Sequence, residues 1–464
     1  MRALHDSNAW KKNAQSRRCI FFSDLNQFDD PFDPTGGGGG GGVPTGASAQ
    51  SEIAEFEPDG GTLALAYGMH LVGGHLILRE DETSPEPTKI KLGIGLGEGG
   101  DQGWDSAVKV WWVGEELSVS PDADTPGYRF HRGIWSTGES DPEQGQDPFF
   151  TDPLTFSGTA YSAIRLTDGQ STPGRVDGHR GIYKCLRVFD YTVNGVASAS
   201  SSYSTNPALI IADGFRRAGK LHRVHWQSLI GVLKPHCDET IPWDKDGDGM
   251  SVDIPRFAAH PVWTRAVGLT EFLDAVCLLC GADWQDDGKL VRFKLATDQT
   301  PRHHFTVDNI APGSFQAQPD RLSERTNWLV VNYRDTDDEF LKQSKLYIKR
   351  ESLIEAYGEI KQEIFLPNMK QSQAARIGQM LMRLSTDNPN KADLVGYSDS
   401  FHLLKGDYAA VTHPVNGWEN ALVRVESKTY LPTSNAPDRC RFTVRKIEGE
   451  IYKDTDHTPK QDVV

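Results

Sequence analysis

Between residues 207 and 280, apolar residues recur with the period of an α-helix. The longest run places Leu269, Phe272, Leu273 and Val276 at positions i, i+3, i+4 and i+7. This spacing puts the four side chains on one helical face, which a folded chain buries. Gly281 follows the last turn, and glycine commonly ends helices. The pattern therefore predicts an amphipathic helix over residues 269–280.

Two shorter helical segments precede this one. Pro207 suits the first turn of a helix, because the N–H group that proline lacks would find no helical partner there, and Gly219 suits the end of the same helix. The second segment has apolar residues at helical spacing from Trp226 to Leu233. Because proline disrupts a helix interior, we expect this second helix to end at Pro235.

Strand-like segments dominate both sides of the helices. Short apolar runs broken by glycine fill residues 60–200, and alternating segments return after residue 320. Asp287-Gly288 lies between two such segments and predicts a hairpin turn. A basic amphipathic helix is expected over residues 373–384. These patterns predict an α+β fold dominated by β-structure, with several small antiparallel sheets or barrels and a few packed helices.

The length and the local composition predict the domain organisation. A chain of 464 residues suffices for about three domains. Seven consecutive glycines, Gly36–Gly42, are typical of a tether or a disordered spacer. The expected parts are an N-terminal arm and glycine-rich linker (1–60), a β-rich domain (61–200), a helix-containing α+β domain (201–320), a barrel-like domain with one helix (321–452) and a loose tail (453–464).

Charge and cysteine content limit the classes of function. The formal net charge is −15, so the average surface repels nucleic acid instead of clamping it. Solubility is the simpler explanation of the same charge. The six cysteines lack the spacing of a disulfide framework, which favours reduced thiols in a protein assembled in a cytoplasm. No window of about 18 uninterrupted apolar residues exists, so we expect no membrane span.

One acidic turn has part of the spacing of a calcium-binding loop. Asp244, Asp246 and Asp248 alternate along the chain and are followed by Gly249, as carboxylates do in such loops. The twelfth position of the loop should be a bidentate glutamate, but it is Pro255 here. A calcium site is therefore one interpretation and an ordinary acidic surface turn is the other. No further cofactor is expected.

Other candidate sites have simpler structural interpretations. Cys277 and Cys280 have metal or redox spacing, but both lie on the apolar face of the predicted helix, which favours core packing. Arg376 and Arg383 could contact DNA, although two arginines on a solvated helix face are the more usual arrangement. We expect no enzymatic activity, because no catalytic motif stands out. Four potential zinc ligands, which flank one short helix at opposite ends, are His222, His225, His236 and Cys237.

The order of several short motifs carries a resemblance to a known family. The motifs are Asn206-Pro207-Ala208, Cys237-Asp238-Glu239, the 269–280 helix, Asp287-Gly288-Lys289, Arg325 with Asn327, Val331 and Tyr333, Gln373-Ala374-Ala375-Arg376, and Lys405-Gly406-Asp407-Tyr408. In this order they resemble the central tail-hub proteins of long-tailed bacteriophages and gene transfer agents. This family includes the tail-tip attachment protein of lambda. The resemblance covers roughly residues 200–450.

The resemblance implies a structural protein of the virion, located at the tail tip. Members of this family form homotrimers of β-rich domains below the last ring of the tail tube. The family's role implies a symmetry adapter and a gated conduit for DNA ejection. It also implies contacts with the distal tail or tail-tube protein and with the tape-measure protein. Genomic DNA would pass through transiently, without specific binding.

One departure from the family and two other classes of function remain open. Lambda-type members continue into fibronectin-like modules and a receptor-binding end, whereas this sequence ends at Val464. The resemblance therefore implies a separate tail fibre or receptor-binding protein. A cell-wall- or polysaccharide-acting hydrolase would need convergent carboxylates. A carbohydrate-binding module would expose Trp111 and Trp112, whereas the hub interpretation predicts that at least one of them packs in a sheet.

Overall fold

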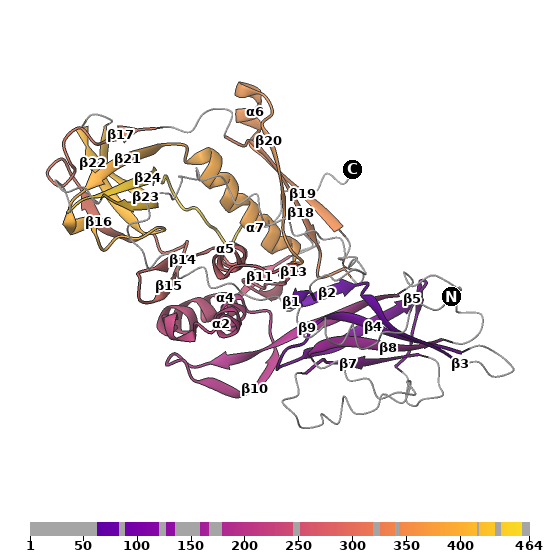
Figure 1. Ribbon diagram of the computed structural model, residues 1–464. Helices are drawn as coiled ribbons and strands as arrows, with labels where there is room; N and C mark the ends of the chain where they lie inside the picture. Colours follow the sequence, from indigo (N-terminus) through magenta and orange to yellow (C-terminus); the bar gives the residue numbers. More distant parts are fainter. Residues whose placement is uncertain are drawn as a thin grey trace, which may run out of the picture.

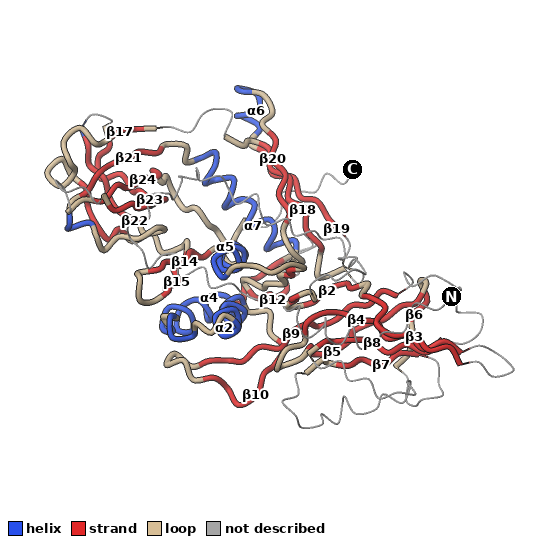
Figure 2. Tube along the Cα trace, in the orientation of Figure 1, coloured by secondary structure: helices blue, strands red, loops and turns tan. Residues whose placement is uncertain are grey.

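The computed structural model describes residues 63–82, 89–119, 127–134, 158–166, 179–244, 251–318, 325–338, 341, 343–414, 417–431 and 438–456. Strands account for 46% and helices for 21% of the described residues, which confirms the predicted β-dominated α+β fold. The strands form several small sheets, and the helices lie between them (Figures 1 and 2). The predicted N-terminal arm lies outside the described residues. The domain boundaries remain a prediction.

Two sheets build the N-terminal part of the fold (Figure 1). Their strands are β2 (Met69–Val72), β3 (His75–Glu82), β4 (Lys89–Glu98), β5 (Trp104–Trp112), β6 (Glu115–Glu116), β7 (Gly127–His131), β8 (Thr159–Leu166), β9 (His179–Tyr191) and β10 (Ala197–Tyr203). One sheet has the order β3-β4-β8-β7; the other has the order β10-β9-β5-β6, with β2 also paired to β9.

The two N-terminal sheets share one core. Trp104 of β5 is fully buried, and Gly97 of β4 leaves room for its indole, because a Cβ at Gly97 would lie 2.6 Å from a Trp104 ring carbon. The hydroxyl groups of Ser162 in β8 and Tyr183 in β9 are hydrogen-bonded across the layers at 2.8 Å. Glycines are therefore frequent in this region because large aromatic side chains approach the backbone of its strands closely.

Helices α2 (Pro207–Arg217) and α5 (Leu269–Leu279) confirm two of the predicted helices. The side chain of Asn206 caps α2 by accepting a hydrogen bond from the N–H of Ala208 at 2.8 Å. Gly219 follows the helix with a φ of +68°, which favours glycine. The helices pack closely, because a Cβ at Gly214 of α2 would lie 2.4 Å from the Phe272 ring of α5.

The prediction that the second helix ends at Pro235 is wrong. The segment begins as α3 (Trp226–Ser228), widens into the π-helical turn η3 (Leu229–Leu233) and continues as α4 (Lys234–Asp238). Pro235 lies in the first turn of α4, where the missing N–H is tolerated. The π-turn shifts the hydrogen-bonding pattern immediately before the proline. The chain therefore continues as a helix through Pro235.

A hairpin follows α5, as the sequence predicts. Its strands β14 (Ala282–Asp286) and β15 (Val291–Leu295) pair in antiparallel register. Gly288 has a φ of +86°, and the Asp287 carboxylate accepts hydrogen bonds from the N–H groups of Lys289 and Leu290. The other short elements here are β1 (Leu65–Ala66), η2 (Leu221–Arg223), β11 (Thr240–Trp243), β12 (Val252–Pro255) and β13 (Val262–Trp263).

The C-terminal part holds two sheets and helix α7 (Gln371–Met382), which continues into the π-helical turn η5 (Arg383–Asp387). The first sheet has the order β19-β18-β20 and the second β16-β22-β23-β24-β21-β17. Because β16 and β22 are parallel, the predicted antiparallel barrel is a mixed sheet. The bounds are β16 (Pro301–Phe305), β17 (Gln316–Ala317), β18 (Trp328–Arg334), β19 (Gln343–Lys349), α6 (Glu351–Tyr357), β20 (Lys361–Phe365), β21 (Lys391–Gly396), η6 (Ser398–Ser400), β22 (Tyr408–His413), β23 (Trp418–Tyr430) and β24 (Cys440–Lys446).

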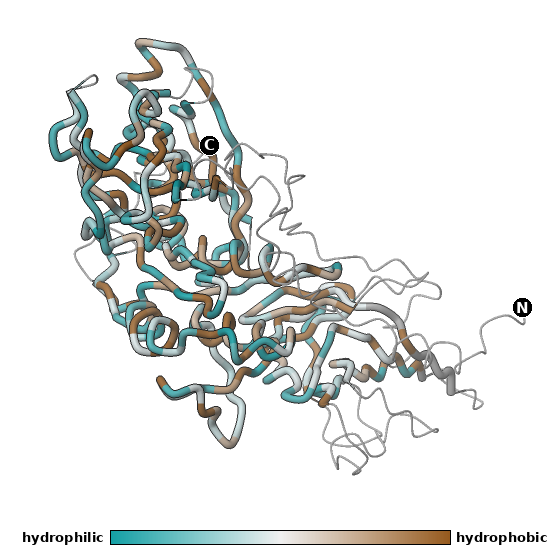
Figure 3. Tube along the Cα trace, turned by 60° about the vertical axis from the view of Figure 1, so that its left-hand side comes forward, coloured by the Kyte–Doolittle hydropathy of each residue, from teal (hydrophilic) through white to brown (hydrophobic). Residues whose placement is uncertain are grey.

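One continuous core runs through most of the described chain. Tyr67 after β1, Phe272 of α5 and Ile377 of α7 all belong to it, whereas the six-stranded sheet has a second core around Phe305 and Phe442. Apolar and polar positions alternate along many of the strands, as half-buried sheets require (Figure 3). None of the helices in the described ranges combines the length and the apolar character needed to cross a bilayer.

Candidate functional site

Buried charged side chains concentrate where the first sheets meet helix α2. Asp213 of α2 is 1% exposed and pairs with both Arg216 and Arg217 of the same helix, at 2.8 Å and 2.7 Å. The hydroxyl of Tyr67 donates to the same carboxylate at 2.7 Å, and Arg217 also pairs with Glu98 of β4 at 2.7 Å. We call these five residues the Asp213 cluster. It joins a strand, a loop and a helix that are far apart in sequence.

The electrostatics of the Asp213 cluster favour fixed charges. Burial by itself would raise the pKa of Asp213, but the adjacent guanidinium groups of Arg217 and Arg216 outweigh burial, so the pKa is lowered. Burial and the neighbouring Asp213 carboxylate raise the pKa of Tyr67 well above its usual value. Tyr67 therefore stays neutral and Asp213 stays ionised near neutral pH. Neither group is poised to exchange protons, which is the behaviour of a structural ion-pair network.

A second set of polar contacts, with a buried arginine and partly exposed carboxylates, joins the end of α4 to the C-terminal segment. Arg256 pairs with Glu239 at 2.5 Å and with Asp454 at 3.0 Å. Arg376 of α7 is completely buried, and its guanidinium group donates to the Tyr452 hydroxyl at 2.5 Å and to the Arg256 carbonyl at 2.8 Å. These contacts connect α7 to segments more than seventy residues away on either side.

Both expectations for the arginines of this helix are wrong. Arg376 does not lie on a solvated face, because the core packs around it. Arg383 pairs with Asp456 at 2.5 Å and donates to the Ile451 carbonyl at 3.1 Å. The helical spacing of the sequence predicted the helix, but it could not show which groups of the C-terminal segment accept hydrogen bonds from the two arginines. Both guanidinium groups are engaged within the chain, so this helix face does not provide a free DNA contact.

Two further ion pairs attach the β14–β15 hairpin to the six-stranded sheet. Lys294 of β15 pairs with the buried Asp407 at 3.2 Å, and Arg424 of β23 pairs with Asp283 of β14 at 2.5 Å. Burial by itself would lower the pKa of Arg424, but the Asp283 carboxylate outweighs burial and raises it. All three sets of contacts therefore hold different sheets and helices together. Their arrangement supports a rigid body and shows no nucleophile paired with a base.

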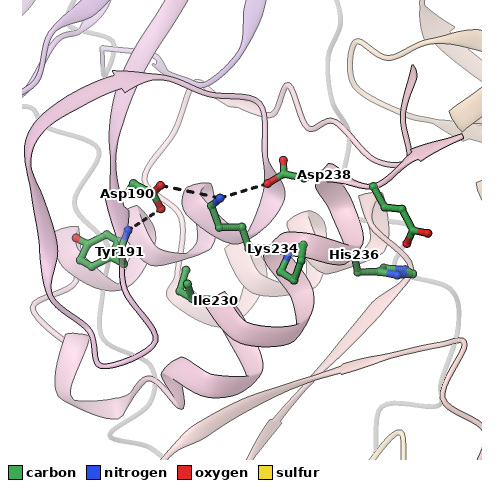
Figure 4. A pocket seen from close by; sticks show the side chains of 8 residues that line it. Asp190, Tyr191, Ile230, Lys234, His236 and Asp238 are labelled. Atoms are coloured by element: carbon green, nitrogen blue, oxygen red, sulfur yellow. Dashed lines mark hydrogen bonds and ion pairs between the residues drawn. The ribbon is translucent and has the colours of Figure 1, made fainter. Parts of the chain in front are cut away.

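An open cleft of about 740 Å³ lies between β9 and α4. Figure 4 shows the Lys234 side chain between two carboxylates, with Asp238 at 3.3 Å and Asp190 at 3.9 Å. Burial and the neighbouring Arg256 guanidinium lower the pKa of His236, at the other end of the cleft, to about 4. Asp190 and Asp238 share the single ammonium group of Lys234, and Glu239 pairs with Arg256. The cleft therefore lacks the pair of free, convergent carboxylates that the hydrolase alternative requires.

The structure brings some of the metal-ligand candidates together, because Cys237 lies beside Cys280 in the main core. Of the three aspartates proposed for calcium, only Asp244 lies within the described residues; Asp246 and Asp248 lie outside them, so the site remains a prediction. Within the described ranges, no group of three or more histidine, cysteine or acidic side chains is placed to hold a metal ion. Cys277 and Cys280 are buried in the main core, as core packing predicts.

Each of the four potential zinc ligands either makes another contact or lies at the surface. The imidazole of His225 accepts a hydrogen bond from the Ser228 N–H at 3.2 Å and so caps α3. His236 contacts Arg256, at 2.9 Å from its guanidinium group, and Cys237 is buried in the main core. His222 lies on the exposed side of η2. A carbohydrate-binding module would expose both Trp111 and Trp112 of β5, but Trp112 is only 4% exposed.

Comparison with known proteins identifies a related fold. No family model matches the sequence, and no curated protein matches it. Among solved structures, a chain of the virion of a native gene transfer agent particle superposes with a TM-score of 0.63 at 14% sequence identity. The match covers 87% of this chain and 89% of that chain. The described chain therefore shares its fold with a component of that virion.

Two further matches are much weaker. A tail protein from Neisseria meningitidis MC58 matches with a TM-score of 0.34 at 10% identity, over 85% of this chain and all of that one. A 43 kDa tail protein of a Shewanella oneidensis prophage matches with a TM-score of 0.30 at 8% identity, over 86% and 99% of the two chains. Superpositions this loose do not establish a common arrangement of the domains.

Proposed function

We propose that this chain is a structural virion protein that forms the trimeric central hub at the distal end of a phage-like tail tube. The observation that carries the proposal is the shared fold with a chain of the gene transfer agent virion, which extends over nearly the whole of both chains. The order of motifs in the sequence supports the same assignment independently of the superposition. In this role the chain adapts the sixfold tube to a threefold tip and opens as a conduit for DNA.

The buried ion pairs suit such a role. A hub transmits load between the tube and the tip, and the three sets of polar contacts connect its sheets and helices to one another. The net charge of −15 suits a lumen past which DNA slides with little adhesion. The acidic lumen is part of the proposal, and a lumen lined mainly by lysine and arginine would contradict it.

The proposal names partners by their place in the tail. A distal tail or tail-tube protein lies above the hub, a tape-measure protein ends at it, and a separate fibre or receptor-binding protein lies beyond it. A trimer is expected because closed cyclic symmetry lets one chain build a ring. The protein would be located at the tail tip of the virion, after assembly in the host cytoplasm.

The test measures the mass and the shape of the purified full-length chain. Light scattering should give about three times the chain mass of 51.4 kDa, and negative-stain images should show a threefold ring. Adding a distal tail protein of the same particle should cap one face of the ring. A chain that binds none of the tail proteins, or that cleaves peptidoglycan or polysaccharide with measurable turnover, would contradict the proposal.

A further inference from the structure

The three-stranded sheet β19-β18-β20 has two very different faces. Alternate residues of its strands, including Leu329, Val331 and Ile348, point toward α7 and belong to the main core. The packing is close, because a Cβ at Gly378 of α7 would lie 2.4 Å from the end of the Ile348 side chain. Side chains alternate between the two faces of a strand. The residues that alternate with them, such as Trp328, Val330 and Tyr347, therefore lie on the opposite face, away from α7.

That opposite face combines lysines with aromatic rings. Lys349 of β19 and Lys361 of β20 flank Trp328 in the strand register, with their ammonium groups 4.4 Å and 5.3 Å from its ring. Tyr347 and Phe365 are 38% and 44% exposed. We call this surface the lysine–aromatic face, and its members are Trp328, Lys345, Tyr347, Lys349, Lys361 and Phe365.

The lysine–aromatic face has the charge opposite to that of the chain. It carries three lysines and one acidic residue, Glu363, which lies opposite Val330 on the same face and pairs with Lys345 at 3.8 Å. Exposed aromatic rings next to lysines form a surface that suits a partner with both acidic and aromatic side chains, through ion pairing and cation–π contacts. A face of this kind is unusual on a chain with a net charge of −15.

Two buried polar atoms beneath this face lack partners. Asn332 of β18 is 2% exposed; its amide nitrogen donates to Glu363 at 2.7 Å, but its side-chain oxygen has no hydrogen bond within the described residues. The indole N–H of Trp328 is also buried without an acceptor there. Buried polar groups are normally satisfied. Polar contacts at this sheet are therefore incomplete within the described residues.

One segment of this chain has the matching chemistry. Residues 21–33, with the sequence Phe-Phe-Ser-Asp-Leu-Asn-Gln-Phe-Asp-Asp-Pro-Phe-Asp, contain four phenylalanines and four aspartates and neither lysine nor arginine. We call these residues the Phe/Asp segment. Its aspartates are complementary to the three lysines, and its rings are complementary to Tyr347, Phe365 and Trp328. Residues 141–156 form another acidic stretch of this kind, with three phenylalanines and three aspartates, but residues 21–33 are denser in both residue types, and a cross-link to residues 141–156 would count against them.

The chain connection allows this contact. Between Asp33 and Leu63 lie residues 34–62, including the seven glycines, and an extended chain of that length spans up to roughly 95 Å. The described chain begins close to this sheet, because the Asn368 side chain, shortly after β20, donates to the Met69 carbonyl of β2 at 2.7 Å. β1 and β2 lie at the foot of β18 in Figure 1. The linker is therefore long enough to reach the lysine–aromatic face of the same chain or of an adjacent copy.

We propose that the Phe/Asp segment, residues 21–33 of this chain, docks on the lysine–aromatic face of the β19-β18-β20 sheet. The aspartates pair with the lysines, and the phenylalanines cover the exposed rings. This contact fixes the N-terminal end of the chain to its C-terminal half. It goes beyond the proposed hub function and does not depend on how many copies assemble.

The experiment places a photo-cross-linker on the face in the full-length chain. Tyr347→p-benzoylphenylalanine preserves an aromatic ring at an exposed position. After irradiation and digestion, mass spectrometry should locate the cross-link within residues 21–33. The matched control is Tyr430→p-benzoylphenylalanine, which is 53% exposed on β23 of the other C-terminal sheet and should give at most a tenth of that yield.

Charge variants then test the pairing. K345E/K349E/K361E should lower the cross-link yield at least fivefold, whereas K289E/K405E/K453E, at three exposed lysines elsewhere, should leave it within twofold. Combining the first triple variant with D24K/D29K/D33K should restore the yield. Cross-links to other regions, equal yields at positions 347 and 430, or no rescue by the reversed charges would overturn the proposal. A cross-link to residues 21–33 supports it whether it lies within one chain or between two copies.

Discussion

The Asp213 cluster and the lysine–aromatic face show two opposite uses of charge in one chain. In the cluster, every cation has a carboxylate within 3 Å and the group is nearly inaccessible to water. On the face, three lysines share a single nearby carboxylate, and two buried polar atoms have no partner in the described chain. Balanced, buried charges hold segments of one chain together. Unbalanced charges beside exposed rings remain available to another segment.

The largest expected effect concerns acid and three buried histidines that lie outside both regions. Burial lowers the pKa values of His70 and His179 to about 4 and that of His260 to about 3. In the unfolded chain each of these histidines binds a proton near pH 6.5, whereas in the folded chain it does so only near its lowered pKa. The histidines therefore do not reduce the unfolding free energy above pH 6.5, and they reduce it increasingly as the pH falls from 6.5 toward 4. For each histidine, the unfolding free energy should fall by roughly 1.4 kcal/mol for every pH unit in this window.

Denaturant titrations at pH 7.5, 6 and 5 measure this loss. The three histidines together should remove about 6 kcal/mol of the unfolding free energy at pH 5. The variant His179→Gln removes a single titrating group, so its unfolding free energy should depend less steeply on pH by about one proton. A pH dependence identical to that of the unsubstituted chain would show that His179 does not titrate on unfolding.

Removing the central carboxylate of the Asp213 cluster should have the next largest effect. Asp213→Ala leaves Arg217 buried with only Glu98 as a partner, and breaking a buried pair in this way typically costs about 3–5 kcal/mol. Chemical denaturation measures the loss. The control Asp190→Ala removes a carboxylate whose side chain is 54% exposed and should change the stability by less than about 0.5 kcal/mol. Equal effects of the two variants would contradict the distinction between the regions.

A smaller loss is expected from the buried arginine of α7. Arg376→Met keeps a long apolar side chain but leaves the Tyr452 hydroxyl and the Arg256 carbonyl without their donor, which should cost about 2–3 kcal/mol. Arg292→Met, at a side chain that is 46% exposed, should cost less than about 1 kcal/mol. If Arg376→Met left stability unchanged but altered DNA binding, the buried placement of Arg376 would be wrong.

The smallest stability change is expected on the lysine–aromatic face. Lys361→Glu alters an exposed side chain without a close ion-pair partner in the described chain, so the unfolding free energy should change by less than about 0.5 kcal/mol. The matched variant Lys294→Glu reverses a cation that is buried beside Asp407 and should destabilise the chain severely. The unfolding temperatures of the two variants compare the effect of reversing an exposed lysine with that of reversing a buried one. Similar unfolding temperatures would contradict the comparison.

The sequence predicts much of the local structure because the relevant signals are local. The 269–280 helix has its apolar residues within three turns, and the cap of α2 and the Asp287-Gly288 turn each depend on neighbouring residues. The continuation through Pro235 was not predicted, because a π-helical turn has no clear sequence signal. The spacing of Asp213, Arg216 and Arg217 is visible in the sequence as a set of helical neighbours.

The tertiary partners could not be predicted in the same way. Tyr67 lies 146 residues from Asp213 along the chain, and the partners of Arg376 come from segments on both sides of it. A single sequence shows neither contact. Arginine is also seldom fully buried, which explains why a solvated face was the natural expectation for α7. The aspartates 246 and 248 of the calcium hypothesis lie outside the described residues, so that hypothesis stays untested.

The central claim is that this chain is a trimeric hub, and an image of the purified full-length protein tests it most directly. Light scattering combined with negative-stain electron microscopy gives both the number of copies and their symmetry. We predict a particle of three copies arranged as a ring around a threefold axis. A stable monomer at every concentration, or a closed particle with twofold symmetry, would contradict the claim.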